Sequence, residues 1–311
     1  MSASMMAAAA PRRTGRGLPC LVMSGLLWGT GGLTGSLLSR ITGLSALSVA
    51  AYRLTGGGLL IVAFLTLAGR RWPAGRAAWT RIAVIGALAA LYQSCYFSAV
   101  ALTSVALATL VAIGTAPVIV LGVRWVTGHR TGRLAPVAAC LALTGLGLLV
   151  GLPSGFSEAA VLASTGLAML AAAAFAAVTL TGARPVAGLD DLTMAGFGFT
   201  AGGLALMPLA ASLGGLGFRP GPEAIGLLIA LGTGPTAVAY SLYFRGLRTA
   251  TASTGALVAL LEPLTGAILA ALVLGQHLRA SGIAGAALLA VAVIIAIVSA
   301  DRGAGLNPRP G

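Results

Sequence analysis

One acidic residue, Glu262, lies inside a long apolar segment, ASTGALVALLEPLTGAILAALVL, at residues 252–274. An ionised side chain near the middle of a bilayer costs at least about 2.5–3.5 kcal/mol. Such a carboxylate is retained by pairing with a cation, by lining a wet cavity or by staying protonated. Glu262 could therefore bind and release a coupling proton or couple to the substrate, or it could hold two helices together in a fixed ion pair with Arg53.

Arg53 is the matching cation, since it also lies inside an apolar segment. Its planar guanidinium could bind a carboxylate or another anionic group through two parallel hydrogen bonds. Alternatively, the side chain could extend along the helix toward the nearer bilayer surface. The glycines Gly56 to Gly58 follow it and would allow a neighbouring helix to approach closely.

Three further residues are candidates for binding a small molecule at the same depth. With 1.5 Å of rise per residue, Trp28, Arg53, Gln93 and Glu262 all fall about 15–18 Å from one bilayer surface. Tyr96-Phe97 and Tyr243-Phe244 fall near span ends and are expected to anchor their helices at the bilayer surface. Tyr92 and Gln93 lie a turn deeper and could form hydrogen bonds with a substrate. Trp28 could stack on a substrate, cap a cavity or simply pack. These residues form the predicted binding or coupling site.

Prolines interrupt three of the apolar segments, at Pro117, Pro235 and Pro263. Each removes a backbone donor and frees the carbonyl four residues earlier, which must find another partner inside a membrane. They could act as simple packing kinks. They could also act as hinges that bring freed backbone carbonyls to a central cavity. Pro117, Pro235 and Pro263 are therefore candidate hinge positions.

The composition indicates the elements that position these residues. Hydrophobic residues make up 58% of the 311 residues and charged residues only 8%, whereas soluble domains carry about 25% charged residues. A bilayer core needs about 20 apolar residues per helix. The sequence therefore predicts an all-α membrane protein with ten transmembrane helices, near residues 18–38, 45–68, 81–101, 104–123, 133–151, 159–181, 191–212, 224–244, 251–274 and 280–300.

The arginines predict the orientation. With the N-terminus inside, fifteen of the nineteen basic residues fall in inner segments, and only Arg40, Arg219 and Arg279 fall in outer loops. Cytoplasmic segments carry such an excess. We therefore expect both termini in the cytoplasm of a bacterial cell, and a multi-pass protein of its inner membrane.

The chain also resembles itself. Residues 96–117 read YFSAVALTSVALATLVAIGTAP and residues 243–263 read YFRGLRTATASTGALVALLEP, so the Tyr-Phe pairs lie 147 residues apart. Five helices per half is an odd number, so the two copies are predicted to be inverted relative to each other. Inverted repeats around a central site are a recurring transporter architecture. We predict repeats at 18–151 and 159–300, with tails at 1–17 and 301–311.

With these features, the sequence resembles the EamA family of the drug/metabolite transporter superfamily. The resemblance rests on Trp28-Gly29, on Arg53, on the two Tyr-Phe-to-Pro segments, on Leu261-Glu262-Pro263 and on Leu274-Gly275-Gln276. The family typically has Gly-Glu where this chain has Gly275-Gln276, so any role of that carboxylate is absent here. The resemblance implies export or uptake of amino acids, related metabolites or drugs without ATP.

Other classes of protein fit less well. Scattered arginines form no basic face, so no nucleic-acid partner is expected. Cys20, Cys95 and Cys140 form no CxxC pair, His129 and His277 lie in loops on opposite faces, and no metal or other cofactor is expected. An enzyme would need a catalytic constellation, and a channel usually assembles from repeated subunits.

The predicted function is secondary transport of a small metabolite by alternating access, with export of an amino acid or related metabolite as the leading expectation. Multidrug efflux is the main alternative, and a membrane-embedded enzyme or channel is the alternative from another class. Its predicted partners are a small-molecule substrate and the lipid bilayer. Export and import stay open, as do proton coupling and facilitated diffusion, and the sequence predicts no particular oligomer.

Overall fold

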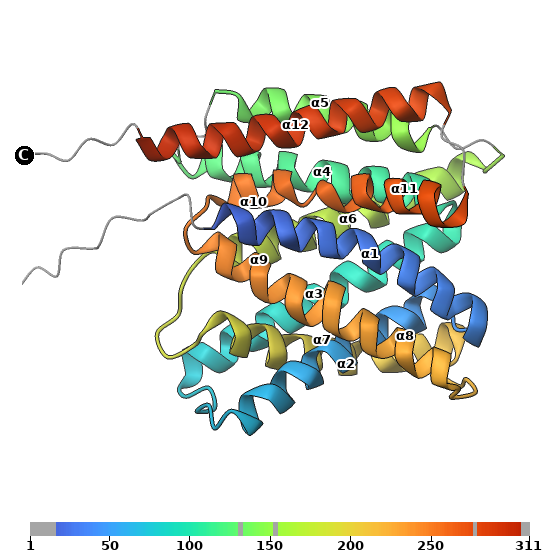
Figure 1. The fold of residues 1–311 in the computed structure, drawn as a ribbon, viewed down its shortest axis with the longest axis vertical. Helices are drawn as coiled ribbons and strands as arrows, with labels where there is room; N and C mark the ends of the chain where they lie inside the picture. Colours follow the sequence, from blue (N-terminus) through green and yellow to red (C-terminus); the bar gives the residue numbers. More distant parts are fainter. Residues whose placement is uncertain (1–16, 130–132, 152–154, 276–278, 306–311) are drawn as a thin grey trace, which may run out of the picture.

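A computed structural model describes residues 17–129, 133–151, 155–275 and 279–305. Across these residues the chain consists of helices and connecting loops, with one isolated bridge between Val186 and Leu189 and no regular strand. The helices run side by side in alternating directions (Figure 1). The prediction of an all-α membrane protein is confirmed.

The first half of the chain contains five helices. Each begins within five residues of its predicted position, and the loops between them carry the glycine, proline and arginine residues that interrupt the apolar pattern. The helices are α1 (Leu18–Thr42), α2 (Ala46–Leu67), α3 (Arg76–Leu102), α4 (Val105–Val126) and α5 (Ala135–Val150).

The second half also crosses five times, but two of its spans are broken into shorter helices. The eighth span consists of α8, a π-helical segment η2 and α9, and the ninth consists of α10 and α11. Nine spans within the described residues are long and apolar enough to cross a bilayer, and the 16-residue α5 is a shorter apolar helix that makes the tenth. The elements are α6 (Glu158–Gly182), α7 (Asp191–Gly214), α8 (Pro222–Gly232), η2 (Thr233–Val238), α9 (Ala239–Leu247), α10 (Ala252–Val258), α11 (Leu261–Leu274) and α12 (Ala280–Gly305).

Polar side chains fix where several helices begin. The side chains of Ser45, Ser104, Ser157 and Asp190 each accept a hydrogen bond from the backbone amide three residues further on. These caps satisfy one of the four free amides at a helix N-terminus. Each span therefore starts at the position that its serine or aspartate sets.

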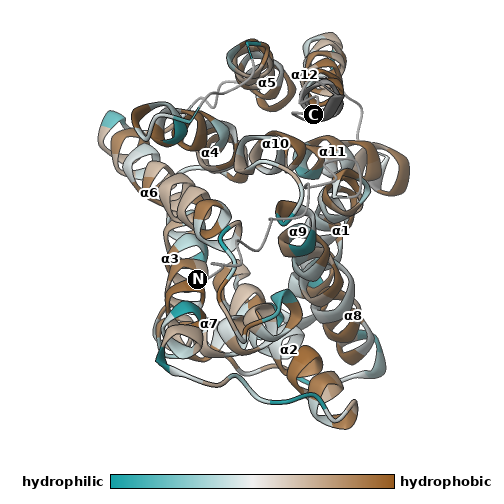
Figure 2. Ribbon diagram, turned by 90° about the vertical axis from the view of Figure 1, so that its left-hand side faces the viewer, coloured by the Kyte–Doolittle hydropathy of each residue, from teal (hydrophilic) through white to brown (hydrophobic). Residues whose placement is uncertain are grey.

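The two halves pack as equivalents of each other. Helix α2 packs on α7, and α5 packs on α12, which are the same helices in the two repeats. The pair α3 and α6 has its counterpart in α9 and α1, and the pair α4 and α6 has its counterpart in α11 and α1. Figure 2 shows this arrangement end-on, with α5 and α12 forming a separate pair beside the other helices. The prediction of two inverted five-helix repeats agrees with this packing.

Glycines allow the closest of these contacts. A Cβ on Gly145 of α5 would lie 2.8 Å from the carbonyl oxygen of Gly285 on α12, and one on Gly86 of α3 would lie 2.6 Å from that of Gly198 on α7. Real Cβ atoms do not approach backbone so closely. The small-residue composition of the sequence is therefore used for helix–helix packing.

Candidate functional site

A cavity of about 460 Å³ opens between α1, α2 and α3. Its wall includes Glu262 at the start of α11, near the middle of the ninth span. It also includes Ser39 and Arg40, where α1 ends, and Val105, where α4 begins. The cavity therefore extends from the interior of the bundle toward the end that carries the α1–α2 and α3–α4 loops. In the orientation predicted from the arginines, that end faces outward.

Four of the five predicted binding residues line this one cavity. Arg53 comes from α2, Tyr92 and Gln93 come from α3, and Glu262 comes from α11. They are brought together because α2 and α3 pack against the second repeat while α11 packs on α1, which also lines the cavity. The depth estimate from the sequence thus placed these residues at one level, and the structure adds that they share one space.

Arg53 and Glu262 do not pair with each other. Among the residues that the structure describes, the one ion pair joins Arg248 and Asp191. The Arg53 Nε and the Gln93 Nε2 are buried without a hydrogen-bond partner. A buried donor left unpaired costs about 1–3 kcal/mol, which is recovered when a bound molecule accepts its hydrogen bond. The cavity wall therefore combines a guanidinium, an amide and a carboxylate that form no ion pair with one another.

Trp28 lies outside the cavity. It is 4% exposed, and its indole ring packs on Tyr240 and Tyr243, with ring centroids 4.8 and 4.9 Å away, and on Phe175 at 6.0 Å. The rings of Phe199 and Phe244 extend this aromatic cluster. Of the interpretations that the sequence left open for Trp28, the structure supports packing in the core.

The two Tyr-Phe pairs lie in different environments from those that the sequence suggested. As amphipathic rings near span ends, they were expected to anchor helices at the bilayer surface. Instead, Tyr96 and Phe97 line the cavity, while Tyr243 and Phe244 are 1% and 0% exposed in the aromatic cluster. The expectation was wrong because helix packing, and not distance from the span end, decides which way each ring points.

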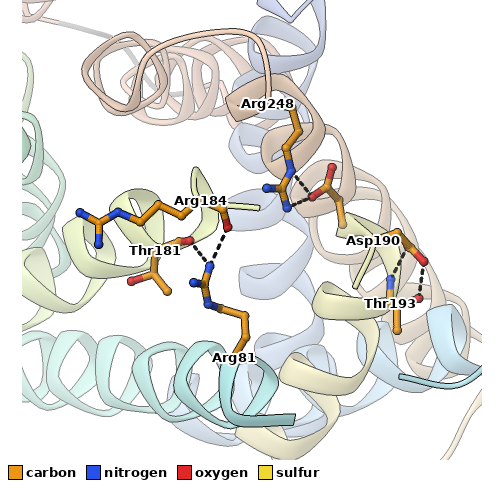
Figure 3. Close-up of polar contacts among 7 residues, drawn as sticks. Arg81, Thr181, Arg184, Asp190, Thr193 and Arg248 are labelled. Atoms are coloured by element: carbon orange, nitrogen blue, oxygen red, sulfur yellow. Dashed lines mark hydrogen bonds and ion pairs between the residues drawn. The ribbon is translucent and has the colours of Figure 1, made fainter. Parts of the chain in front are cut away.

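Polar contacts close the other end of the bundle (Figure 3). The Arg81 Nη1 donates to the carbonyl oxygens of Thr181 and Arg184, the latter at 2.8 Å, and so ties α3 to the end of α6. The Arg248 guanidinium pairs with the Asp191 carboxylate, which ties α9 to α7. Together with the aromatic cluster, these contacts seal the bundle at the end opposite to the cavity mouth.

The three predicted hinge prolines behave differently. At Pro235 the chain forms the π-helical segment η2, and the Thr236 hydroxyl donates to the freed carbonyl of Leu231 at 2.8 Å. At Pro263 the ninth span is broken, and the Glu262 amide donates to the carbonyl of Ala259 at 2.9 Å. Pro117 lies inside an unbroken α4.

These contacts show that chain neighbours take up two of the freed carbonyls. The carbonyl groups freed by Pro235 and Pro263 are therefore not free acceptors in the cavity. A hinge role for the three prolines stays a prediction.

Sequence reasoning missed part of the cavity wall. Gly31, Gly32 and Gly35 of α1 line it, and a Cβ on Gly32 would meet no atom within 4 Å. The repeat identifies Tyr96 and Phe97, but their place near a span end predicts the bilayer surface and not the cavity. The signal that could have found them is their equivalence to Tyr243 and Phe244, because equivalent residues of inverted repeats lie on either side of a shared centre.

Comparison with known proteins identifies the class of the molecule. The chain is 28% identical over 282 residues to the uncharacterized transporter YwfM of Bacillus subtilis, covering 88% of this chain and 91% of that protein. It is 25% identical over 299 residues to the uncharacterized inner membrane transporter YicL of Salmonella typhimurium, covering 93% and 97%.

A solved crystal structure has the same fold. The similarity has a TM-score of 0.76 at 23% sequence identity, and it covers 93% of this chain and 98% of the other. The model of the EamA-like transporter family matches twice, at residues 15–151 and 163–298. The chain is a multi-pass membrane protein that belongs to the EamA-like transporter family of the drug/metabolite transporter superfamily.

Proposed function

We propose that this transporter lies in the inner membrane of a bacterium. We propose further that it exports an amino acid or a related small metabolite across that membrane by alternating access. The observation that carries the substrate class is that Arg53 and Glu262 line the same cavity without forming an ion pair. Opposite charges that face a shared space and do not neutralise each other suit a molecule that carries both charges. The similarity to YicL, an inner membrane transporter, supports this location.

The binding mode follows from the chemistry of these groups. The Arg53 guanidinium would take the carboxylate of the substrate, because its fork matches the two oxygens. The Glu262 carboxylate would take the ammonium group. Tyr92, Tyr96 and Phe97 would contact the remaining side chain of the substrate, and the cavity of about 460 Å³ is of the size that holds a small metabolite.

Alternating access is supported by the difference between equivalent elements. Tyr96 and Phe97 line an open cavity, while their counterparts Tyr243 and Phe244 are buried at the sealed end. If the two repeats exchange conformations, the wall around Tyr96 closes and the cluster around Tyr243 opens. The exchange carries a bound molecule across without an open pore.

Energy for export would come from protons bound at Glu262. One elementary charge crossing 100 mV releases about 2.3 kcal/mol. Protonation of Glu262 would remove the partner of the substrate ammonium group, so proton binding and substrate binding would compete at one carboxylate. Facilitated diffusion needs no such competition, which makes the two mechanisms separable by experiment.

The test compares metabolites in cells and in medium after expression of the wild type, of Glu262→Gln, and of Glu223→Gln as a matched control. Glu223 lies exposed at the start of α8 and outside the cavity. A small set of amino acids or related acids should accumulate outside with the wild type and the control, and not with Glu262→Gln. Equal export by all three proteins would contradict a role for Glu262. Resistance to toxic cations with no change in metabolites would favour multidrug efflux.

A further inference from the structure

A second and larger hollow lies on the side of the bundle, near the sealed end. It has a volume of about 710 Å³ and lies between α2, the start of α7, η2 and α9. Its apolar wall includes Leu60, Phe64 and Val238, which are 41%, 58% and 43% exposed. We call this hollow the lateral groove. It shares no lining residue with the central cavity.

The lateral groove has the length of one bilayer leaflet. Along the eighth span it extends from Thr233 on η2 to Arg245 on α9, and twelve residues of helix rise about 18 Å. Half of a hydrocarbon core is about 15 Å. The groove therefore begins near the bilayer centre and ends where the headgroups of the adjacent leaflet lie.

Its charges are concentrated at the headgroup end. Arg70 follows α2, Arg245 lies in the last turn of α9, and both are exposed. Asp190 and Asp191 line the same end. The Asp190 carboxylate accepts two hydrogen bonds from Thr193, and the Asp191 carboxylate pairs with Arg248.

In the part of the chain that the structure describes, neither Arg70 nor Arg245 has an acidic partner. Two arginines at the interface and an apolar channel toward the bilayer centre match the two parts of an anionic phospholipid. We propose that the lateral groove binds one anionic phospholipid, with its phosphate on Arg70 and Arg245 and an acyl chain along Leu60, Phe64 and Val238.

The deep end of the groove lies close to the central cavity, although the two spaces share no lining residue. Thr233 and Ala237 line the groove from η2. From the same segment, Pro235 faces α1, where a Cβ on Gly31 would lie 3.1 Å from the Pro235 Cβ and 3.6 Å from the Arg53 Nη1. The acyl chain would therefore end one helix away from Arg53.

The test uses purified full-length protein, freed of lipid and incubated with equal amounts of phosphatidylglycerol and phosphatidylethanolamine of the same chain length. Native mass spectrometry then counts each bound lipid. The wild type should retain phosphatidylglycerol in preference. The double variant Arg70→Gln, Arg245→Gln should lose about 30-fold in this preference, since each arginine near an anionic headgroup contributes about fivefold.

Two further double variants keep the result specific. Arg219→Gln with Arg279→Gln removes the same charge from exposed loop arginines outside the groove, and should retain the preference. Arg70→Lys with Arg245→Lys should retain most of it, which a purely structural role of the arginines would not predict. Ser241→Trp fills the groove with both arginines intact and should lower the binding of both lipids.

Equal retention of both lipids by the wild type would overturn the proposal, as would equal losses in the two Arg→Gln double variants. If the wild type retains neither lipid and Ser241→Trp impairs transport, the groove is a path for substrate. This result would also overturn the proposal. None of these outcomes bears on the substrate of the central cavity.

Discussion

Tyr96 and Tyr243 occupy equivalent positions in the two repeats, and each tyrosine hydroxyl is bonded to a threonine hydroxyl at 2.7 Å, but across different helix pairs. The Tyr96 hydroxyl bonds Thr109 on α4, beside the open cavity. The Tyr243 hydroxyl bonds Thr179 on α6, inside the sealed end. Equivalent tyrosines therefore join different pairs of helices, α3 to α4 beside the cavity and α9 to α6 at the sealed end.

This difference predicts unequal accessibility of equivalent residues. Val100 lines the cavity, while Leu247, at the same spacing of 147 residues, is 2% exposed. In a background that lacks the three native cysteines, Val100→Cys should react with a hydrophilic thiol reagent at least about tenfold faster than Leu247→Cys, since a buried thiol reacts only when its surroundings open. During turnover with substrate, the thiol reagent should react with Leu247→Cys faster than it does without substrate. Rates that stay unchanged by substrate would argue against exchange of the two states.

Arg53 and Glu262 line one cavity without forming an ion pair, which predicts how substitutions at the two residues combine. Arg53→Gln and Glu262→Gln should each weaken substrate binding by about ten- to hundredfold, since a hydrogen bond to a charged group contributes about 1.5–3 kcal/mol. The double variant should be no more active than either single one. Arg40→Gln, at the mouth of the same cavity, should change binding by less than about threefold. Activity restored in the double variant would instead indicate a structural pair.

Two adjacent glycines of α1 predict opposite effects of one substitution. In Gly32→Leu the new side chain would point into open space in the cavity and should block transport. The same substitution should slightly raise the melting temperature, because leucine favours helix over glycine by about 0.8 kcal/mol. Gly31→Leu meets Pro235 and should lower the stability by about 1–3 kcal/mol through overpacking. Thermal unfolding and transport assays on both proteins check the pair. A stable, fully active Gly32→Leu would show that this part of the cavity is not used.

The contact between α5 and α12 predicts a stability effect with no direct effect on the site. Gly145→Ala places a methyl group 2.8 Å from the Gly285 carbonyl oxygen and should cost about 1–3 kcal/mol. Gly147→Ala is the matched control, because its nearest neighbour is Leu110 Cδ1 at 4.0 Å. Unfolding in detergent should separate the two variants, and the substrate affinity of folded Gly145→Ala should stay at the wild-type value.

The π-helical segment predicts a requirement for one hydroxyl group. Thr236→Val keeps the shape of the side chain but leaves the Leu231 carbonyl unpaired, which should cost about 1–3 kcal/mol. Thr233→Val, on the exposed side of the same segment, should change stability by no more than about 0.5 kcal/mol. Equal effects of the two substitutions would show that Thr236 does not support the segment.

The sequence predicted the spans well because the bilayer imposes a simple requirement of about 20 apolar residues per helix. It also placed Arg53, Gln93 and Glu262 at one depth, since helical rise is constant. Depth, however, does not say which way a side chain points around its helix. Trp28 has the right depth and faces α9 and α6 instead of the cavity.

Local breaks were harder to foresee for a similar reason. Pro117 and Pro263 occupy equivalent positions, but α4 stays continuous while the ninth span breaks at Ala259 and Leu260. The outcome depends on which groups can bond the freed carbonyls, and these groups are positioned by the fold. The Thr236 hydroxyl at η2 is such a group, and its partner could not be read from the chain order.

The ion pair between Arg248 and Asp191 adds a charge interaction at one end of the bundle that has no counterpart at the equivalent position of the other end. The position equivalent to Arg248 in the first repeat is Ala101, which carries no charge. A partly exposed pair contributes about 0.2–1 kcal/mol, and 1 kcal/mol corresponds to about a fivefold change in population. In a transporter that works by alternating access, this ion pair would favour the conformation whose cavity opens toward the arginine-poor side. The return of the empty protein from that conformation would then be the slow step of each cycle.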